Sequence, residues 1–293
     1  MKQFAGTLYG LAGFTFFSIH DVIIKVLSSY YLPIQIIFFT SLIAVPIALF
    51  LIASTGDLKS LRPVYPKIML ARVIILSITG ICVFFAISTI PLAEVYALLF
   101  SSPIIITALS VPILSEQVGW RRWIAVMIGF CGVLIILQPN VTIPQLGHLA
   151  AISAAFGISV NSIFLRKFGT KEQGGLVLLY PLIGNIVIMG VLLPLVYVPM
   201  PLEHLGLLSL VSIFSIIAMG FLIFAYRVSE AALVAPMQYS QMIWGIILGW
   251  LLFAETVETH VLVGAIIIIF SGIFIFLREV KKNVPSSITE LPI

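Results

Sequence analysis

Charged side chains are scarce in this 293-residue chain: only 9% of its residues are Asp, Glu, Lys or Arg, whereas 61% are hydrophobic. Soluble domains carry about 25% charged and about 45–50% apolar residues. A molecule of this size cannot hide so much apolar surface from water, so part of that surface must face lipid. The composition therefore excludes a soluble enzyme, a secreted module and a disordered chain.

Cysteines and the signatures of catalysis are also few or missing. Cys82 and Cys131 lie in apolar stretches without C-x-x-C spacing, which predicts packing residues rather than a disulfide or a metal site. The four histidines have no metal-ligand spacing, and no P-loop, H-E-x-x-H or G-x-S-x-G motif occurs. We therefore expect no enzyme activity, no cofactor and no metal. The 15 basic residues form no patch, so we expect no nucleic-acid partner either.

Long apolar runs dominate what is present. A helix needs about 20 mostly apolar residues to cross the hydrocarbon core of a bilayer. An open sheet cannot satisfy its backbone in lipid and no run alternates as a barrel strand does, so we predict an all-α integral membrane protein with ten transmembrane helices. The expected spans are 4–27, 32–53, 68–89, 92–114, 121–138, 145–166, 176–197, 205–228, 231–253 and 260–278.

The basic residues are sorted along these spans. With a cytoplasmic N-terminus, all but one of the 15 fall at cytoplasmic helix ends, loops or tails, and only Lys25 falls on the outer side. This pattern predicts a multi-pass membrane protein with both termini in the cytoplasm. The cytoplasmic set is Lys2, Lys59, Arg62, Lys67, Arg72, Arg121, Arg122, Arg166, Lys167, Lys171, Arg227, Arg278, Lys281 and Lys282.

The two halves of the chain resemble each other when residues 85–116 are laid on 224–255. Each half contains five spans, an odd number, so the halves must cross the bilayer in opposite senses. We expect two inverted five-helix repeats at 4–138 and 145–279, with a cytoplasmic tail at 280–293. Secondary transporters often have this design and bind solute near the midplane. The matched pairs are Phe85/Phe224, Ala86/Ala225, Ala93/Ala232, Val95/Val234, Ser101/Ser240 and Glu116/Glu255.

A family resemblance rests on the repeats and on two motifs. The phrases Ile90-Pro-Leu-Ala-Glu94 and Leu114-Ser-Glu116, the latter followed by Arg121-Arg-Trp123, resemble the EamA type of the drug/metabolite transporter superfamily over nearly the whole chain. His20-Asp21-x-x-x-Lys25 and Ala235-Pro-Met-Gln-Tyr-Ser-Gln241-x-x-Trp244 resemble, within that superfamily, carriers of riboflavin, S-adenosylmethionine and related metabolites.

This resemblance implies a secondary transporter that moves a small organic metabolite by alternating access. An amino-acid or drug exporter on the same scaffold is the alternative. A membrane-embedded enzyme and a passive channel are the competing classes, although the enzyme would need a cluster of catalytic acids or histidines that the sequence lacks. We expect the partners to be the solute and the lipid bilayer, with the chain a monomer or a homodimer.

Polar side chains inside the spans are the candidate substrate-binding residues, because lipid tolerates few of them without a function. Asp21 and Lys25 lie one helical turn apart, so they either pair with each other or serve a solute or proton. Gln238 and Gln241 lie on one face of the ninth span, which also carries glycines. The glycines by themselves would indicate close helix–helix packing, which does not explain the two glutamines. The candidates are Asp21, Lys25, Ser101, Ser102, Asn161, Tyr180, Asn185, Gln238, Tyr239, Gln241 and Trp244.

Several polar residues have a structural explanation as well. A single asparagine such as Asn161 or Asn185 is as often a helix–helix contact as a ligand. Arg72 is interpreted mainly as an orientation charge, and Glu94 as a favourable acid in the first turn of a helix. Glu116 and Glu255 are interpreted as caps of the helices that follow them.

Overall fold

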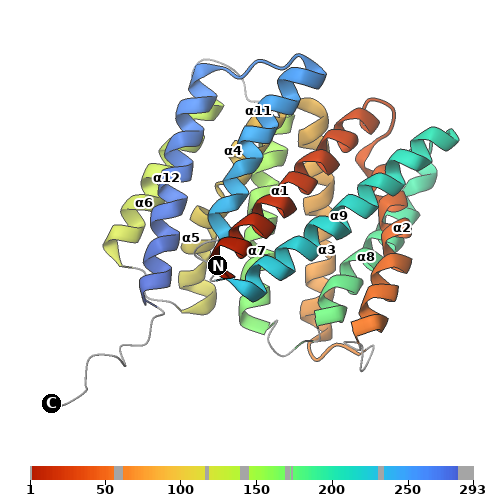
Figure 1. The fold of residues 1–293 in the computed structure, drawn as a ribbon, viewed down its shortest axis with the longest axis horizontal. Helices are drawn as coiled ribbons and strands as arrows, with labels where there is room; N and C mark the ends of the chain where they lie inside the picture. Colours follow the sequence, from red (N-terminus) through yellow and green to blue (C-terminus); the bar gives the residue numbers. More distant parts are fainter. Residues whose placement is uncertain are drawn as a thin grey trace.

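The computed structural model describes residues 2–55, 62–115, 119–138, 145–168, 172, 174–229 and 234–282, and all regular structure within them is helical (Figure 1). The elements are α1 (Lys2–Leu27), α2 (Pro33–Thr55), α3 (Pro66–Thr89), α4 (Leu92–Leu99), α5 (Ser102–Leu114), α6 (Trp120–Leu137), α7 (Leu146–Phe168), α8 (Gly174–Leu192), the 3₁₀ turn η2 (Leu193–Leu195), α9 (Leu202–Val228), the 3₁₀ helix η3 (Ala235–Tyr239), α11 (Ser240–Phe253) and α12 (Thr259–Lys282).

These elements confirm the ten expected membrane crossings, with two differences. The fourth crossing is interrupted between α4 and α5, and the ninth begins as the 3₁₀ helix η3 before α11. The last helix continues to Lys282, so the first residues of the expected tail are helical, and 283–293 lie outside the described residues. Pro33 and Pro66 open α2 and α3, where a missing backbone N–H costs nothing because first-turn donors have no helical partner.

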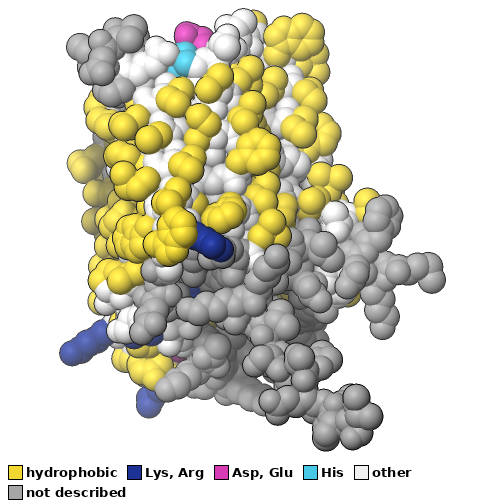
Figure 2. All heavy atoms as spheres, turned by 90° about the vertical axis from the view of Figure 1, so that its left-hand side faces the viewer, with side chains coloured by type: hydrophobic (Ala, Val, Ile, Leu, Met, Phe, Trp, Pro, Cys, Tyr) yellow, Lys and Arg dark blue, Asp and Glu magenta, His cyan; other side chains and the backbone are white. Residues whose placement is uncertain are grey.

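An apolar belt surrounds the bundle. Seven described segments are long and apolar enough to cross a membrane, and α6 and α12 contribute shorter apolar stretches at Trp123–Leu137 and Thr259–Ile275. Hydrophobic side chains cover most of the face in Figure 2, with basic side chains toward its lower part and a histidine beside an acid at its upper end. This arrangement is that of an integral membrane protein.

The pattern of helix pairing stays the same when each helix is replaced by its counterpart in the other half. α1 packs along α9 and α3 along α7, while α2 pairs with α8, α4 with α11 and α6 with α12. In Figure 1 the α6–α12 and α2–α8 pairs stand at opposite sides of the bundle. Two turns repeat the pattern at matched positions of the halves, because Ser115 and Ala254 end α5 and α11 with φ of 56° and 54°. The fold is therefore two inverted five-helix repeats.

The end of the bundle that the sequence predicts to face outward is tied to the long connection between α8 and α9. The Gln35 amide donates to the Val198 carbonyl at 2.6 Å and accepts the Val198 N–H at 2.9 Å. Tyr31, in the turn between α1 and α2, bonds His204 of α9 at 2.6 Å. Burial, with Tyr30 and Tyr197 nearby, raises the pKa of the Tyr31 hydroxyl above its ordinary value.

Small residues allow α6 and α12 to approach closely, and we expect Gly264→Ala to destabilise the protein. A Cβ on Gly264 would lie 2.6 Å from the Gly132 carbonyl oxygen and 2.5 Å from an Ile136 carbon. Because backbone cannot move aside as a flexible side chain does, this overpacking should cost about 1–3 kcal/mol. Thermal unfolding in detergent measures the effect.

Gly220→Ala is the matched control, since a Cβ at Gly220 in α9 has no atom within 4 Å in the described structure. It should leave the melting temperature unchanged or raise it slightly, because alanine has the better helix propensity. Equal melting temperatures for the two variants would contradict the close approach of α6 and α12.

Candidate functional site

Both repeats break a membrane-crossing helix at the same place. Phe100 and Ser101 separate α4 from α5, and the repeat-related Tyr239 and Ser240 join η3 to α11. Their backbones are alike: Phe100 has φ −66° and ψ −8°, and Tyr239 has φ −67° and ψ −15°. Both ψ values are much less negative than those of a regular α-helix. Interrupted helices at corresponding positions of two inverted repeats indicate the binding region of a transporter.

Prolines and serines explain the breaks. Pro103 has no N–H, so the helical hydrogen bond to the Leu99 carbonyl cannot form. Ser101 Oγ instead donates to the Leu98 carbonyl at 2.6 Å, and Ser240 Oγ donates to the Met237 carbonyl at 2.7 Å. The two serines thus make the same bond, each to the residue three positions earlier. The side chains of Ser101 and Ser240, which match in the repeat alignment, therefore stabilise the local backbone at the two breaks.

The two breaks contact each other inside the bundle. The rings of Phe100 and Tyr239 contact edge-to-face, with centroids 5.0 Å apart and planes at 85°. The Tyr239 hydroxyl lies against Gly272 of α12, where a Cβ would collide with it. We call Phe100, Ser101, Tyr239 and Ser240 the helix-break site.

Asp21 lies beside this site, on α1. Its Oδ2 accepts a hydrogen bond from the Tyr96 hydroxyl at 2.8 Å, and its Oδ1 is 2.9 Å from His20 Nδ1. Tyr96, only 2% exposed, stands one turn before Phe100, and its ring packs against Gly245 of α11. Asp21 therefore connects α1 to the helix-break site through Tyr96. The described residues give it no Lys or Arg partner.

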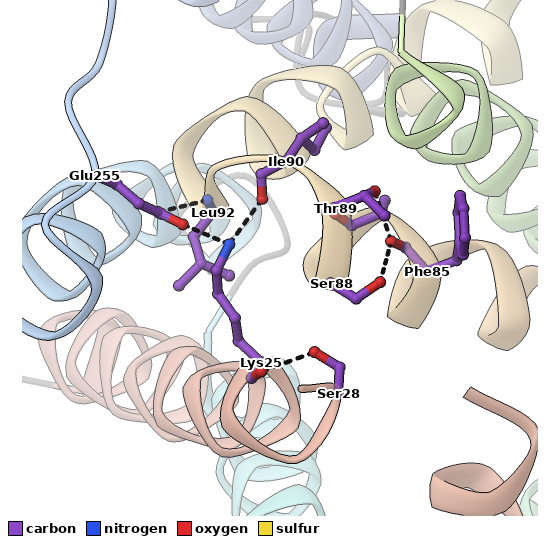
Figure 3. A network of polar contacts seen from close by, with 9 residues as sticks. Lys25, Ser28, Phe85, Ser88, Thr89, Ile90, Leu92 and Glu255 are labelled. Atoms are coloured by element: carbon purple, nitrogen blue, oxygen red, sulfur yellow. Dashed lines mark hydrogen bonds and ion pairs between the residues drawn. The ribbon is translucent and has the colours of Figure 1, made fainter. Parts of the chain in front are cut away.

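Of the two alternatives for Asp21 and Lys25, the structure contradicts the mutual ion pair. Lys25 Nζ instead forms a 2.5 Å ion pair with Glu255 Oε1 and donates to the Ile90 carbonyl at 2.8 Å (Figure 3). Glu255 Oε2 also accepts the Leu92 N–H at 3.0 Å, so this carboxylate caps α4. The sequence had instead predicted that Glu255 caps the following helix, α12. We call Lys25, Glu255, Ile90 and Leu92 the outer ion-pair cluster, after the side of the membrane that the sequence predicts for it.

The glutamines of the ninth crossing are the most polar part of this region. Gln238 and Gln241 are partly buried, and within the described part of the chain neither side chain makes a hydrogen bond. Trp244, one turn after Gln241, is also partly buried, whereas Ile243 and Ile247 are exposed to lipid. Amide donors and acceptors beside aromatic rings are what a small-molecule site offers to a polar heterocycle.

The remaining candidates lie outside the helix-break site as defined above, and three of them contact neighbouring helices. Asn161 Oδ1 accepts a hydrogen bond from Arg72 Nε at 3.0 Å, and Asn185 Oδ1 accepts one from Ser77 Oγ at 2.6 Å, so both amides join α3 to its neighbours. Ser102 offers its carbonyl to Ser159 Oγ at 3.1 Å. Tyr180 is partly buried on α8, next to Pro181. Glu116 and Glu230 lie outside the described residues.

Sequence reasoning missed the residues that join distant helices. Tyr96 sits in an apolar run and carried no signal. The histidines were considered only as metal ligands, whereas His148 Nε2 lies 2.8 Å from Glu94 Oε2 and ties α7 to α4. Arg72 was assigned to orientation, although the structure buries it. The partners of these residues are distant in the sequence, and only the repeat symmetry could have suggested those contacts.

Comparisons with known proteins agree with this geometry. A crystal structure that is 16% identical superimposes with a TM-score of 0.65 over 94% of this chain and 98% of its own, which shows a shared fold. A riboflavin transporter from Vibrio cholerae is 31% identical over 66% of this chain and 65% of its own length. An S-adenosylmethionine uptake transporter from Rickettsia prowazekii is 26% identical over 92% of this chain and 91% of its own.

A family model matches the chain twice, once in each half. The EamA-like transporter family model covers residues 4–138 and 145–277. The two matches include both helix breaks and nearly all the described helices. The chain therefore belongs to the EamA-like transporter family, within the drug/metabolite transporter superfamily.

Proposed function

We propose that this small-metabolite transporter carries a heterocyclic solute of the riboflavin or S-adenosylmethionine type across the bacterial inner membrane by alternating access. The observation that carries this proposal is the meeting of two repeat-related helix breaks at Phe100 and Tyr239. Aromatic rings and the amides of Gln238 and Gln241 suit a flat ring with polar edges. The relatives named above support the solute class.

The moving units in this proposal are the repeats at 4–138 and 145–279. Contacts between the halves must break and form as access alternates, and the outer ion-pair cluster joins α1 and α4 of the first half to the segment after α11 of the second. The cluster is intact, so this conformation is closed at that end. Basic residues at the opposite end, such as Arg121 and Lys167, support cytoplasmic termini, with the 280–293 segment also in the cytoplasm.

Counterflow in proteoliposomes tests the function. Liposomes containing the full chain and loaded with unlabelled S-adenosylmethionine or riboflavin are diluted into a trace of the labelled compound. A carrier exchanges label for unlabelled solute and accumulates it transiently above equilibrium, whereas a channel only equilibrates it. Absence of such an overshoot for both compounds, relative to empty liposomes, would contradict the proposal.

A pair of tryptophans tests the site. Trp244→Ala should weaken solute affinity about tenfold, because an aromatic ring stacked on a heterocycle contributes about 1–3 kcal/mol. Trp250→Ala, at a side chain on the same helix that is 66% exposed to lipid, should leave affinity unchanged. The half-saturating concentration for counterflow measures both. Equal effects of the two substitutions would mean that Trp244 does not bind the solute.

A further inference from the structure

Arg72 is a buried cation inside the bundle. It lies on α3 with only 4% of its surface exposed. Its Nε donates to Asn161 Oδ1 at 3.0 Å, and its Nη1 contacts the Met69 sulfur, a weak acceptor, at 3.4 Å. No carboxylate in the described part of the chain lies within ion-pair distance of it. Among the described residues, most of its N–H donors therefore have no acceptor.

A buried guanidinium without a counter-charge destabilises the folded protein. Removing a charge from water costs several kcal/mol unless a counter-charge and hydrogen bonds compensate for it. An orientation charge avoids this cost by extending its side chain to the membrane surface, which Arg72 does not do. An ionisable residue retained inside a bundle is by default a functional residue.

The guanidinium lines a small cleft, partly open to the surface, between α3, α7 and α8. Phe164 and Phe168 of α7 and Val177 of α8 form its apolar walls. Glu172 lies at the same cleft, where its two carboxylate oxygens accept the Val64 N–H at 3.1 Å and the Tyr65 N–H at 2.7 Å. The cleft thus holds one fixed cation and one fixed anion with apolar surface between them.

We propose that this cleft binds the α-amino-acid head of the transported metabolite, with its carboxylate on Arg72 and its ammonium toward Glu172. Planar guanidinium groups bind carboxylates through two parallel hydrogen bonds, for which the Nη atoms supply the donors. The opposite charges make the cleft neutral overall, which suits a zwitterion better than a simple anion. The inference rests on the proposed function and selects S-adenosylmethionine-type solutes over riboflavin-type ones.

Equilibrium binding to the purified full chain in neutral detergent tests this inference with two probes, S-adenosylmethionine and its decarboxylated form. The wild type should prefer the carboxylate-bearing probe about tenfold or more, since a hydrogen bond to a charged group contributes about 1.5–3 kcal/mol. Arg72→Gln should abolish the preference and Arg72→Lys should reduce it, because lysine keeps the charge without the planar fork. Arg121→Gln, at an exposed arginine near the same membrane surface, should retain it.

Equal affinity of the wild type for both probes, or no binding of either, would overturn the inference. So would a preference that survives unchanged in both Arg72 variants. An anionic lipid headgroup offers the same kind of oxyanion, so phosphatidylglycerol is added in a second arm. Displacement of the probe by this lipid from the wild type but not from Arg72→Lys would assign the cleft to lipid instead.

The counterflow experiment separates this inference from the proposed function. Arg72-dependent binding without any counterflow would contradict transport while leaving the cleft assignment intact. Counterflow of S-adenosylmethionine with the same carboxylate preference in both Arg72 variants as in the wild type would contradict only the cleft assignment.

Discussion

Replacing Asp21 by asparagine is expected to lower the transport rate about tenfold to a hundredfold while the protein stays folded. The side chains are nearly the same size, and an amide oxygen can still accept the Tyr96 hydroxyl bond seen at 2.8 Å. What is lost is the carboxylate charge beside the helix-break site, and interactions of a charged group contribute about 1.5–3 kcal/mol. Initial rates of counterflow at matched protein density measure the effect.

Three further measurements determine what Asp21 does. Tyr96→Phe removes the same hydrogen bond but keeps the charge, so it should reduce the rate less. Glu258→Gln neutralises a carboxylate that is 73% exposed in the loop before α12, and should change nothing. If Asp21→Asn loses gradient-driven uptake but keeps exchange, Asp21 carries a coupling proton; loss of both assigns it to the solute. Wild-type rates of Asp21→Asn in both assays would mean that Asp21 has no role in transport.

The membrane crossings could be predicted because a single physical requirement decides them. A segment in lipid must be long, apolar and helical, and runs such as 32–53 satisfy this without reference to the rest of the chain. The helix breaks were only partly visible. Pro103 and Pro236 lie close to the two breaks in the sequence, but the edge-to-face contact of Phe100 with Tyr239 requires the two halves to be brought together.

Side-chain partners could not be predicted for the same reason. The i, i+4 spacing allowed an Asp21–Lys25 pair as one of two alternatives, because residues one helical turn apart can reach each other. The structure instead places Glu255, from the other half of the chain, at the end of the Lys25 side chain. The left-handed turn at Ala254, with φ of 54°, directs the chain so that Glu255 returns over α11 and reaches α4. Nothing local to Lys25 encodes that turn.

Lys25→Met is expected to open the outer end of the bundle. Lys25 and Glu255 are each only 13% exposed, so removing one partner leaves the other charge poorly compensated in the closed conformation. Removing one partner of a fully buried pair costs about 3–5 kcal/mol. An open conformation would hydrate the remaining Glu255, so that cost falls on the closed conformation alone. At about 3 kcal/mol the population should shift toward the outward-open state about a hundredfold.

Thiol accessibility measures this shift. In a Cys82→Ser/Cys131→Ser background, Gln241→Cys places one thiol beside the helix-break site, and a membrane-impermeant maleimide is added from outside. Lys25→Met should accelerate labelling strongly, and Lys25→Met/Glu255→Met should restore most of the slow rate, because the closed state then buries no lone charge. Lys167→Met is the control: this lysine bonds the Ile113 carbonyl at 2.7 Å at the opposite end, so outside labelling should not rise. Labelling that is equally slow with and without Lys25 would mean that the ion pair stabilises the fold but does not close the outer end.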